Sequence, residues 1–127
     1  MNEKDLTIWG RKLNVRVIFD HYSGENILQE QKDSLRLLLE NMEVVDNTLD
    51  DVKMYCLKMD GSEIDNKEIP NIFKYVMPQS IYVGRPDNKN ICGVAVICSY
   101  RFDPEENIAI SFRNNKFVKI QSETALI

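Results

Sequence analysis

The hydrophobic periodicity of this chain changes twice along its length, and this change constrains the fold more than any other feature. Residues 6–10 and 13–19 alternate apolar and polar side chains about a turn at Gly10-Arg-Lys12, a pattern typical of a β-hairpin with one buried face. Residues 23–59 switch to helical spacing, and residues 80–120 return to short apolar runs separated by turn residues. This order predicts an α+β fold, with helices on one face of an antiparallel sheet.

The helical stretch predicts two amphipathic helices. The first is expected to begin at Ser23, whose side chain can accept hydrogen bonds from the first turn, and to run to about Asn41. Its buried stripe would be formed by Leu28, Gln31, Leu35, Leu38, Leu39 and Met42. Its outer face would carry the ion pairs Asp33–Arg36 and Arg36–Glu40. The second helix has apolar residues at Val45, Leu49, Val52, Cys56 and Met59 and ends at Asp60-Gly61, where glycine can adopt the left-handed conformation.

The C-terminal part predicts an antiparallel meander. A polar loop at 60–71 and a short helical or irregular piece at 72–77, ending at Pro78, lead into it. Strands are expected at about 80–84, 91–101, 107–112 and 115–120, the last two joined by a turn at Asn114-Asn115. No βαβ alternation is visible, which disfavours a doubly wound nucleotide-binding fold. At 127 residues the chain is expected to form a single domain spanning 1–127.

Composition excludes several classes of protein. Hydrophobic residues make up 43% and charged residues 28%, so disorder is improbable. No apolar run approaches the roughly 18 residues of a membrane helix, and the N-terminus lacks a secretory pattern, so a cytoplasmic location is expected. The three cysteines, Cys56, Cys92 and Cys98, show no metal-binding spacing and are assigned to the core as reduced thiols.

Motifs for catalysis, cofactors and metals are weak. The glycines are isolated, which excludes both the P-loop and the dinucleotide-binding fingerprint. Asp60-Gly-Ser-Glu-Ile-Asp65 departs from a calcium loop because its glycine is second. The single histidine, His21, could act as a general base with Asp20 or a cysteine, but no pattern selects its partner. We therefore expect no catalytic residue, no metal and no cofactor.

One charged segment stands out. Residues 40–68 hold nine acidic and three basic residues, which makes nucleic acid and anionic membranes improbable partners for this segment. Five of the acidic residues lie within twelve positions without an intervening Lys or Arg: Glu40, Glu43, Asp46, Asp50 and Asp51. They form either a solvated helix face or a docking surface for a basic partner. Trp9, Tyr22 and Tyr55 are the candidate aromatic anchors for such an interface.

The C-terminal strands resemble a family of small uncharacterised bacterial domains. The resemblance rests on a strand ending in an aromatic and acidic turn, Tyr100-Arg-Phe-Asp-Pro-Glu-Glu106, and on a short final strand, Asn115-Lys-Phe-Val-Lys-Ile120. The N-terminal hairpin and Gln31 ahead of Leu35 fit as well. The chain departs from the family pattern at Glu106-Asn-Ile-Ala109, where a glycine-containing turn is usual, and at Ile120-Gln121, where the last position is usually glycine.

Members of that family occur beside polymorphic and contact-dependent toxins. The resemblance implies an immunity protein: a small acidic cytoplasmic protein, favoured as a monomer, that binds and neutralises one toxin domain, often a basic nuclease. Binding through the acidic helix-and-loop region 40–68, which contains the five acidic residues, is the leading hypothesis. The alternatives are a small hydrolase or ligand-binding domain that uses His21, and a structural assembly module whose sheet edge pairs with a second copy.

Overall fold

The chain begins with a β-hairpin that turns at Trp9-Gly10. In the computed structural model, which describes residues 3–126, β1 (Glu3–Ile8) pairs antiparallel with β2 (Arg11–Phe19). Both turn residues have positive φ, 50° at Trp9 and 83° at Gly10, as a tight two-residue hairpin loop requires. The predicted hairpin is confirmed, with its turn one residue earlier than the predicted Gly10-Arg-Lys12.

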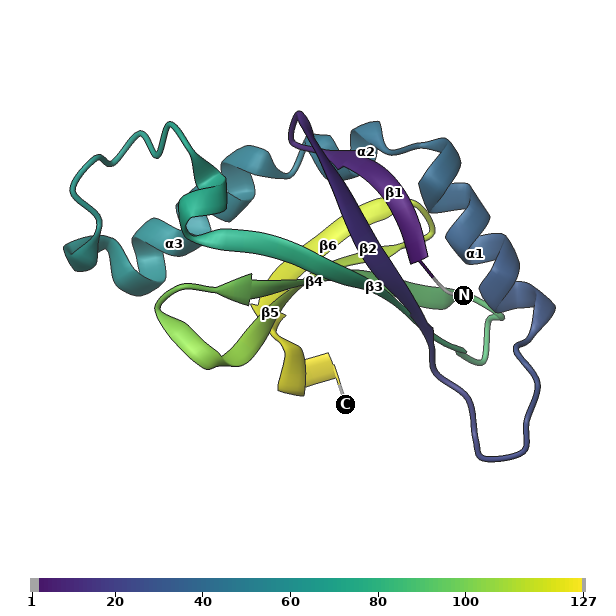
Figure 1. Cartoon of the computed structure of the whole chain (residues 1–127). Helices are drawn as coiled ribbons and strands as arrows, with labels where there is room; N and C mark the ends of the chain where they lie inside the picture. The colour runs from purple at the N-terminus through teal and green to yellow at the C-terminus, as the bar shows by residue number, and fades with distance from the viewer. Residues whose placement is uncertain (1–2, 127) are drawn as a thin grey trace.

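The sheet has six strands in the spatial order β1-β2-β3-β4-β5-β6 (Figure 1). The later strands are β3 (Val76–Pro86), β4 (Cys92–Tyr100), β5 (Asp103–Arg113) and β6 (Lys116–Ser122). From β3 onward every pairing is antiparallel, which confirms the predicted meander. The turn between β5 and β6 is Asn114-Asn115, with φ of 51° and 61°, as predicted.

One strand pairing was not predicted. β2 and β3 run parallel, with Val17 opposite Ile81. The long helical connection between them carries the chain back along the sheet, which a parallel pair requires. β3 also begins earlier than predicted: the short helical piece is only a 3₁₀ turn at Ile72–Lys74, and Pro78 lies within β3 beside a bulge, where a missing N–H is tolerated.

Helices pack on the sheet, as the sequence predicted (Figure 1). They are α1 (Gln29–Glu40), α2 (Glu43–Asp46) and α3 (Leu49–Asp60). The predicted second helix is therefore divided into a single turn, α2, and a longer helix, α3. The break follows from Thr48, which is buried and whose hydroxyl donates to the Val45 carbonyl at 2.6 Å, a local bond that competes with helix continuation.

The start of α1 corrects the sequence prediction. The helix begins at Gln29, and Ser23 lies in the preceding loop beside Gly24, which has a φ of 80°. Gln31 is completely buried and fixes this start: its Oε1 accepts from the Leu28 N–H at 3.0 Å, and its Nε2 donates to the Asp20 carbonyl at 2.7 Å. One side chain thus ties the end of β2 to the first turn of α1.

The core lies between the helices and the sheet. Its helix side is formed by Leu35, Leu38, Val45, Val52 and Cys56, and its sheet side includes Val15, Val17, Ile81, Val96, Ile110 and Phe112. All three cysteines are buried and free, as predicted. Met59 was predicted to be buried, but its side chain is 57% exposed. Within residues 3–126, no helix is both long and apolar enough to cross a bilayer.

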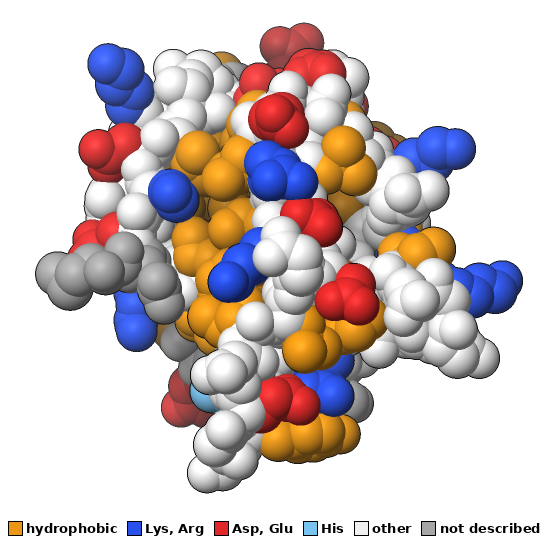
Figure 2. All heavy atoms as spheres, turned by 90° about the vertical axis from the view of Figure 1, so that its right-hand side faces the viewer, with side chains coloured by type: hydrophobic (Ala, Val, Ile, Leu, Met, Phe, Trp, Pro, Cys, Tyr) orange, Lys and Arg blue, Asp and Glu red, His pale blue; other side chains and the backbone are white. Residues whose placement is uncertain are grey.

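The side of the molecule that carries α1 and the loop after β2 mixes both charge signs. Figure 2 shows a band of hydrophobic side chains there, bordered by Lys, Arg, Asp and Glu. The predicted Asp33–Arg36 pair forms at 2.8 Å, whereas Arg36–Glu40 is not among the ion pairs of the described residues. The charges of α1 are thus partly compensated.

Candidate functional site

The five acidic residues of the predicted docking surface lie on three consecutive elements. Glu40 ends α1, Glu43 and Asp46 bound α2, and Asp50 and Asp51 occupy the first turn of α3. All five are exposed, and within residues 3–126 none lies within 4.0 Å of a Lys or Arg charge. We call this set the acidic surface. Because the predicted second helix is interrupted at Asn47-Thr48, Glu43 and Asp46 lie on α2 and Asp50 lies on α3.

Asp46 also has a structural role. Its Oδ1 accepts from the Trp9 N–H at 2.8 Å, and the Trp9 indole Nε1 donates to the Val45 carbonyl at 3.2 Å. These two bonds hold the tip of the β1–β2 hairpin against α2. Trp9 is half-buried by this contact and packs on Phe73, with ring centroids 5.9 Å apart. It is therefore a structural contact rather than an exposed anchor.

The other four acidic residues make no such hydrogen bond within residues 3–126, and two of them stabilise the helix on which they lie. Asp50 and Asp51 lie at the N-terminus of α3, where carboxylates interact favourably with the exposed amides of the first turn. Glu40 lies at the C-terminus of α1, where that interaction is unfavourable. The acidic surface is thus only partly explained by the stability of the helices.

Sequence reasoning missed a group of exposed apolar side chains close to the acidic surface. Met54 and Met59 on α3 are 65% and 57% exposed, and Phe117 on β6 is 36% exposed. Met54 could have been found, because it lies off the apolar stripe of the predicted helix. Tyr55, one of the candidate anchors, is half-buried beside these side chains. Tyr22, another candidate, is exposed in the loop after β2, where the Arg85 guanidinium lies over its ring.

His21 lies in the loop after β2 and lines a hollow of about 420 Å³ with Arg16 and Phe19 among others. It is exposed, and its Nδ1 lies 3.1 Å from the Tyr22 carbonyl oxygen. Asp20 is engaged elsewhere, because its Oδ2 accepts from the Tyr82 hydroxyl at 2.8 Å. Burial raises the pKa of the Cys56 thiol to about 11, so that thiol is not a ready nucleophile at neutral pH. In the described part of the chain, no group of three or more His, Cys, Asp or Glu residues could hold a metal ion.

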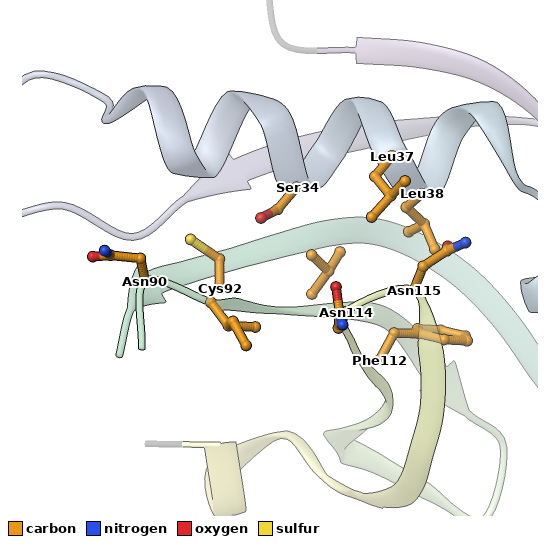
Figure 3. A pocket seen from close by; sticks show the side chains of 10 residues that line it. Ser34, Leu37, Leu38, Asn90, Cys92, Phe112, Asn114 and Asn115 are labelled. Carbon is orange, nitrogen blue, oxygen red and sulfur yellow. The ribbon is translucent and has the colours of Figure 1, made fainter. Parts of the chain in front are cut away.

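Other hollows also lie away from the acidic surface. One, of about 440 Å³, is on the sheet face beside the C-terminal 3₁₀ turn and is lined by Tyr82, Ala95, Ser111 and Leu126 among others. Another, of about 100 Å³, lies between α1 and β4 (Figure 3). There the Ser34 hydroxyl and the Cys92 thiol lie on facing walls, and burial raises the pKa of Cys92. Its size suits a few water molecules.

Comparison with known proteins places the chain in a family. A family model described as a domain of unknown function, DUF6985, matches residues 2–126. The chain belongs to this family. No curated protein and no solved structure matches the chain.

The DUF6985 description names no activity, ligand or partner, so the resemblance to toxin-linked domains stays a prediction. The surface of this DUF6985 domain places carboxylates that have no ion-pair partner within residues 3–126 next to exposed apolar side chains. Interfaces between proteins combine these two kinds of side chain.

Proposed function

We propose that this chain is a non-enzymatic protein-binding domain whose acidic surface docks a basic partner protein. One observation carries the proposal: all five carboxylates are exposed, and none is neutralised by a Lys or Arg within residues 3–126. Like charges placed close together repel one another and weaken a helix slightly. A basic partner would relieve this repulsion, and the field of the acidic surface would accelerate its approach.

The exposed apolar side chains support the same role. Stable interfaces place apolar and aromatic side chains at the centre and charged side chains at the rim. Met54, Met59 and Phe117 supply the apolar part, and Asp50 and Asp51 precede Met54 on the same helix. Methionine is suited to such a surface because its flexible side chain adapts to a partner.

A bacterial toxin domain is the first partner class to test. The resemblance of residues 92–120 to toxin-linked domains suggests it, and basic nuclease toxins match the charge of the acidic surface. On this proposal the domain is a cytoplasmic immunity protein that covers the active site or another functional surface of the toxin. Its mechanism is tight, charge-steered binding, and it needs no cofactor.

The test uses the full chain and the purified product of the adjacent gene, titrated by calorimetry at two salt concentrations. The expected result is a nanomolar complex that weakens as salt rises. In the variant Glu40→Lys/Glu43→Lys/Asp50→Lys, which spares Asp46, affinity should fall at least tenfold. No binding by the unaltered chain would refute this partner.

A matched control separates the surface from overall charge. Glu63, Asp65 and Glu68 are exposed in the loop after α3 and can be changed to Lys with the same change in net charge. The control variant should keep most of the affinity. Equal losses in both variants would show that total charge, rather than the acidic surface, drives binding.

A further inference from the structure

A groove runs along α3, on the side that faces β5 and β6. It consists of two adjoining hollows of about 250 and 270 Å³ that share Tyr55 as a wall. The first hollow follows α3 from Tyr55 to Asp60 and continues onto Tyr100 of β4 and Glu106 of β5. The second hollow follows α3 from Asp51 to Lys58 and reaches Phe117 of β6. We call these two hollows together the α3 groove.

The α3 groove exposes apolar surface to water. Met54, Met59 and Phe117 line it, and all three are exposed, the two methionines by more than half. Single exposed apolar residues are ordinary, but several along one groove indicate an interaction site. From Asp51 to Asp60 the groove follows the helix for roughly 14 Å, which matches about four residues of extended chain.

One end of the α3 groove combines aromatic rings with carboxylates. The ring centroid of Tyr100 lies 6.0 Å from that of Tyr55 and 5.6 Å from that of Phe102. Asp60 accepts from the Tyr100 hydroxyl at 2.5 Å, and Asp103 and Glu106 line the same hollow.

The charge at this end is uncompensated. No Lys or Arg lines the hollow, and within residues 3–126 none of its three carboxylates forms an ion pair. Burial raises the pKa of Tyr55, and Cys56 and three carboxylates raise it further: Asp60, Asp103 and Glu106. The electric field of these carboxylates therefore reaches the aromatic wall of the groove. This end of the groove therefore favours a cation that can also lie against aromatic rings.

We propose that the α3 groove binds an arginine-bearing segment of the partner, with the guanidinium group at the end lined by Tyr55, Tyr100 and Asp103. This inference rests on the proposed function and names the part of the basic partner that docks there. Guanidinium is weakly hydrated, stacks on aromatic faces and donates to carboxylates, whereas the lysine ammonium is strongly hydrated. A hollow of about 250 Å³ has room for such a group, since one water occupies roughly 30 Å³ in the liquid.

The test is an NMR titration of the ¹⁵N-labelled full chain with the capped peptide acetyl-Ala-Leu-Arg-Leu-amide. The comparison peptide carries citrulline, which has nearly the same shape as arginine and no charge. The arginine peptide should cause saturable shifts at Tyr55, Tyr100 and Phe102, and the citrulline peptide should bind about tenfold more weakly. Equal binding by both peptides, shifts confined to other residues, or no saturable shift would overturn the proposal.

Two variants sharpen the test. Asp103→Asn should weaken the arginine peptide about threefold and leave the citrulline peptide unchanged, because only the cation senses the lost charge. Asp65→Asn, an exposed carboxylate outside the groove, is the matched control and should change neither. An equal effect of the two variants would contradict the assignment.

The two proposals fail differently. If Glu40→Lys/Glu43→Lys/Asp50→Lys abolishes partner binding but the peptide does not bind, the groove assignment is wrong and the acidic surface stands. If the peptide binds in the α3 groove and that triple variant keeps full affinity for the partner, the acidic surface is wrong and the groove is the docking site.

Discussion

Replacement of Gln31 by leucine tests how the helical layer is attached to the sheet. Gln31 has no exposed surface, and its amide bonds to both sides of the β2–α1 loop. The Leu28 N–H donates to it at 3.0 Å, and it donates to the Asp20 carbonyl at 2.7 Å and, over longer distances, to the Gly84 and Val83 carbonyls. Gln31→Leu keeps a similar volume but removes every one of these bonds.

The expected cost follows from the groups left without a partner. The Val83 carbonyl still accepts from the Asp20 N–H at 2.9 Å, so the main losses fall on the Leu28 N–H and the Asp20 carbonyl. A partly buried polar group that loses its partner costs about 1–3 kcal/mol, and the added apolar burial of leucine returns about 1 kcal/mol. The free energy of unfolding should therefore fall by about 3 kcal/mol, which lowers the Tm by roughly 10 °C.

Urea denaturation followed by circular dichroism measures this change. The matched control is Gln29→Leu, two residues earlier, where the side chain is exposed and donates to Asp33 at 2.9 Å. This control should change stability by less than about 0.5 kcal/mol. If Gln31→Leu also changes stability by less than about 0.5 kcal/mol, the buried amide does not anchor α1, and the reasoning is refuted.

Three further outcomes are expected. Asp46→Ala should lower stability by about 1 kcal/mol in urea titrations because the Trp9 N–H loses its acceptor, whereas Glu43→Ala should have little effect. Burial and Asp20 raise the pKa of Tyr82 to about 12 in the folded state. The protonated Tyr82 hydroxyl therefore contributes its full stabilisation below pH 10, and this stabilisation is lost as the pH rises toward 12. Tyr82→Phe should reduce the loss of stability between pH 9 and pH 11.5, measured as the free energy of unfolding at each pH. Cys56 and Cys98 should resist iodoacetamide at pH 8 until urea unfolds the chain, and rapid labelling of the native protein would contradict their burial.

Much of the fold could be predicted because its signals are local. Alternation predicted the N-terminal hairpin, short apolar runs between turn residues predicted the strands of the meander, and helical spacing placed Leu35 and Leu38 correctly in the core. Asn114-Asn115 predicted its own turn, since asparagine tolerates the positive φ that a two-residue hairpin loop needs. None of these inferences depends on contacts distant in sequence.

The errors fall where distant contacts decide. Ser23 offered a helix cap, but the buried Gln31 amide, bound to the Asp20 carbonyl, sets the start of α1 instead. The break between α2 and α3 depends on the burial of Thr48 against the rest of the core. The parallel pairing of β2 with β3 depends on the path of the helical connection, which periodicity does not encode.

The amino-acid sequence by itself determined the element types, the α+β class and the exposure of the acidic surface, because charged side chains seldom leave water without a partner. Only the tertiary structure decided that Met59 is exposed, since an apolar stripe is buried only where another layer covers it. It alone also brought Tyr55, Tyr100 and Glu106 to one groove. Tyr55 lies more than forty positions before Tyr100 and Glu106 in the chain, and their juxtaposition follows from the packing of α3 beside the sheet.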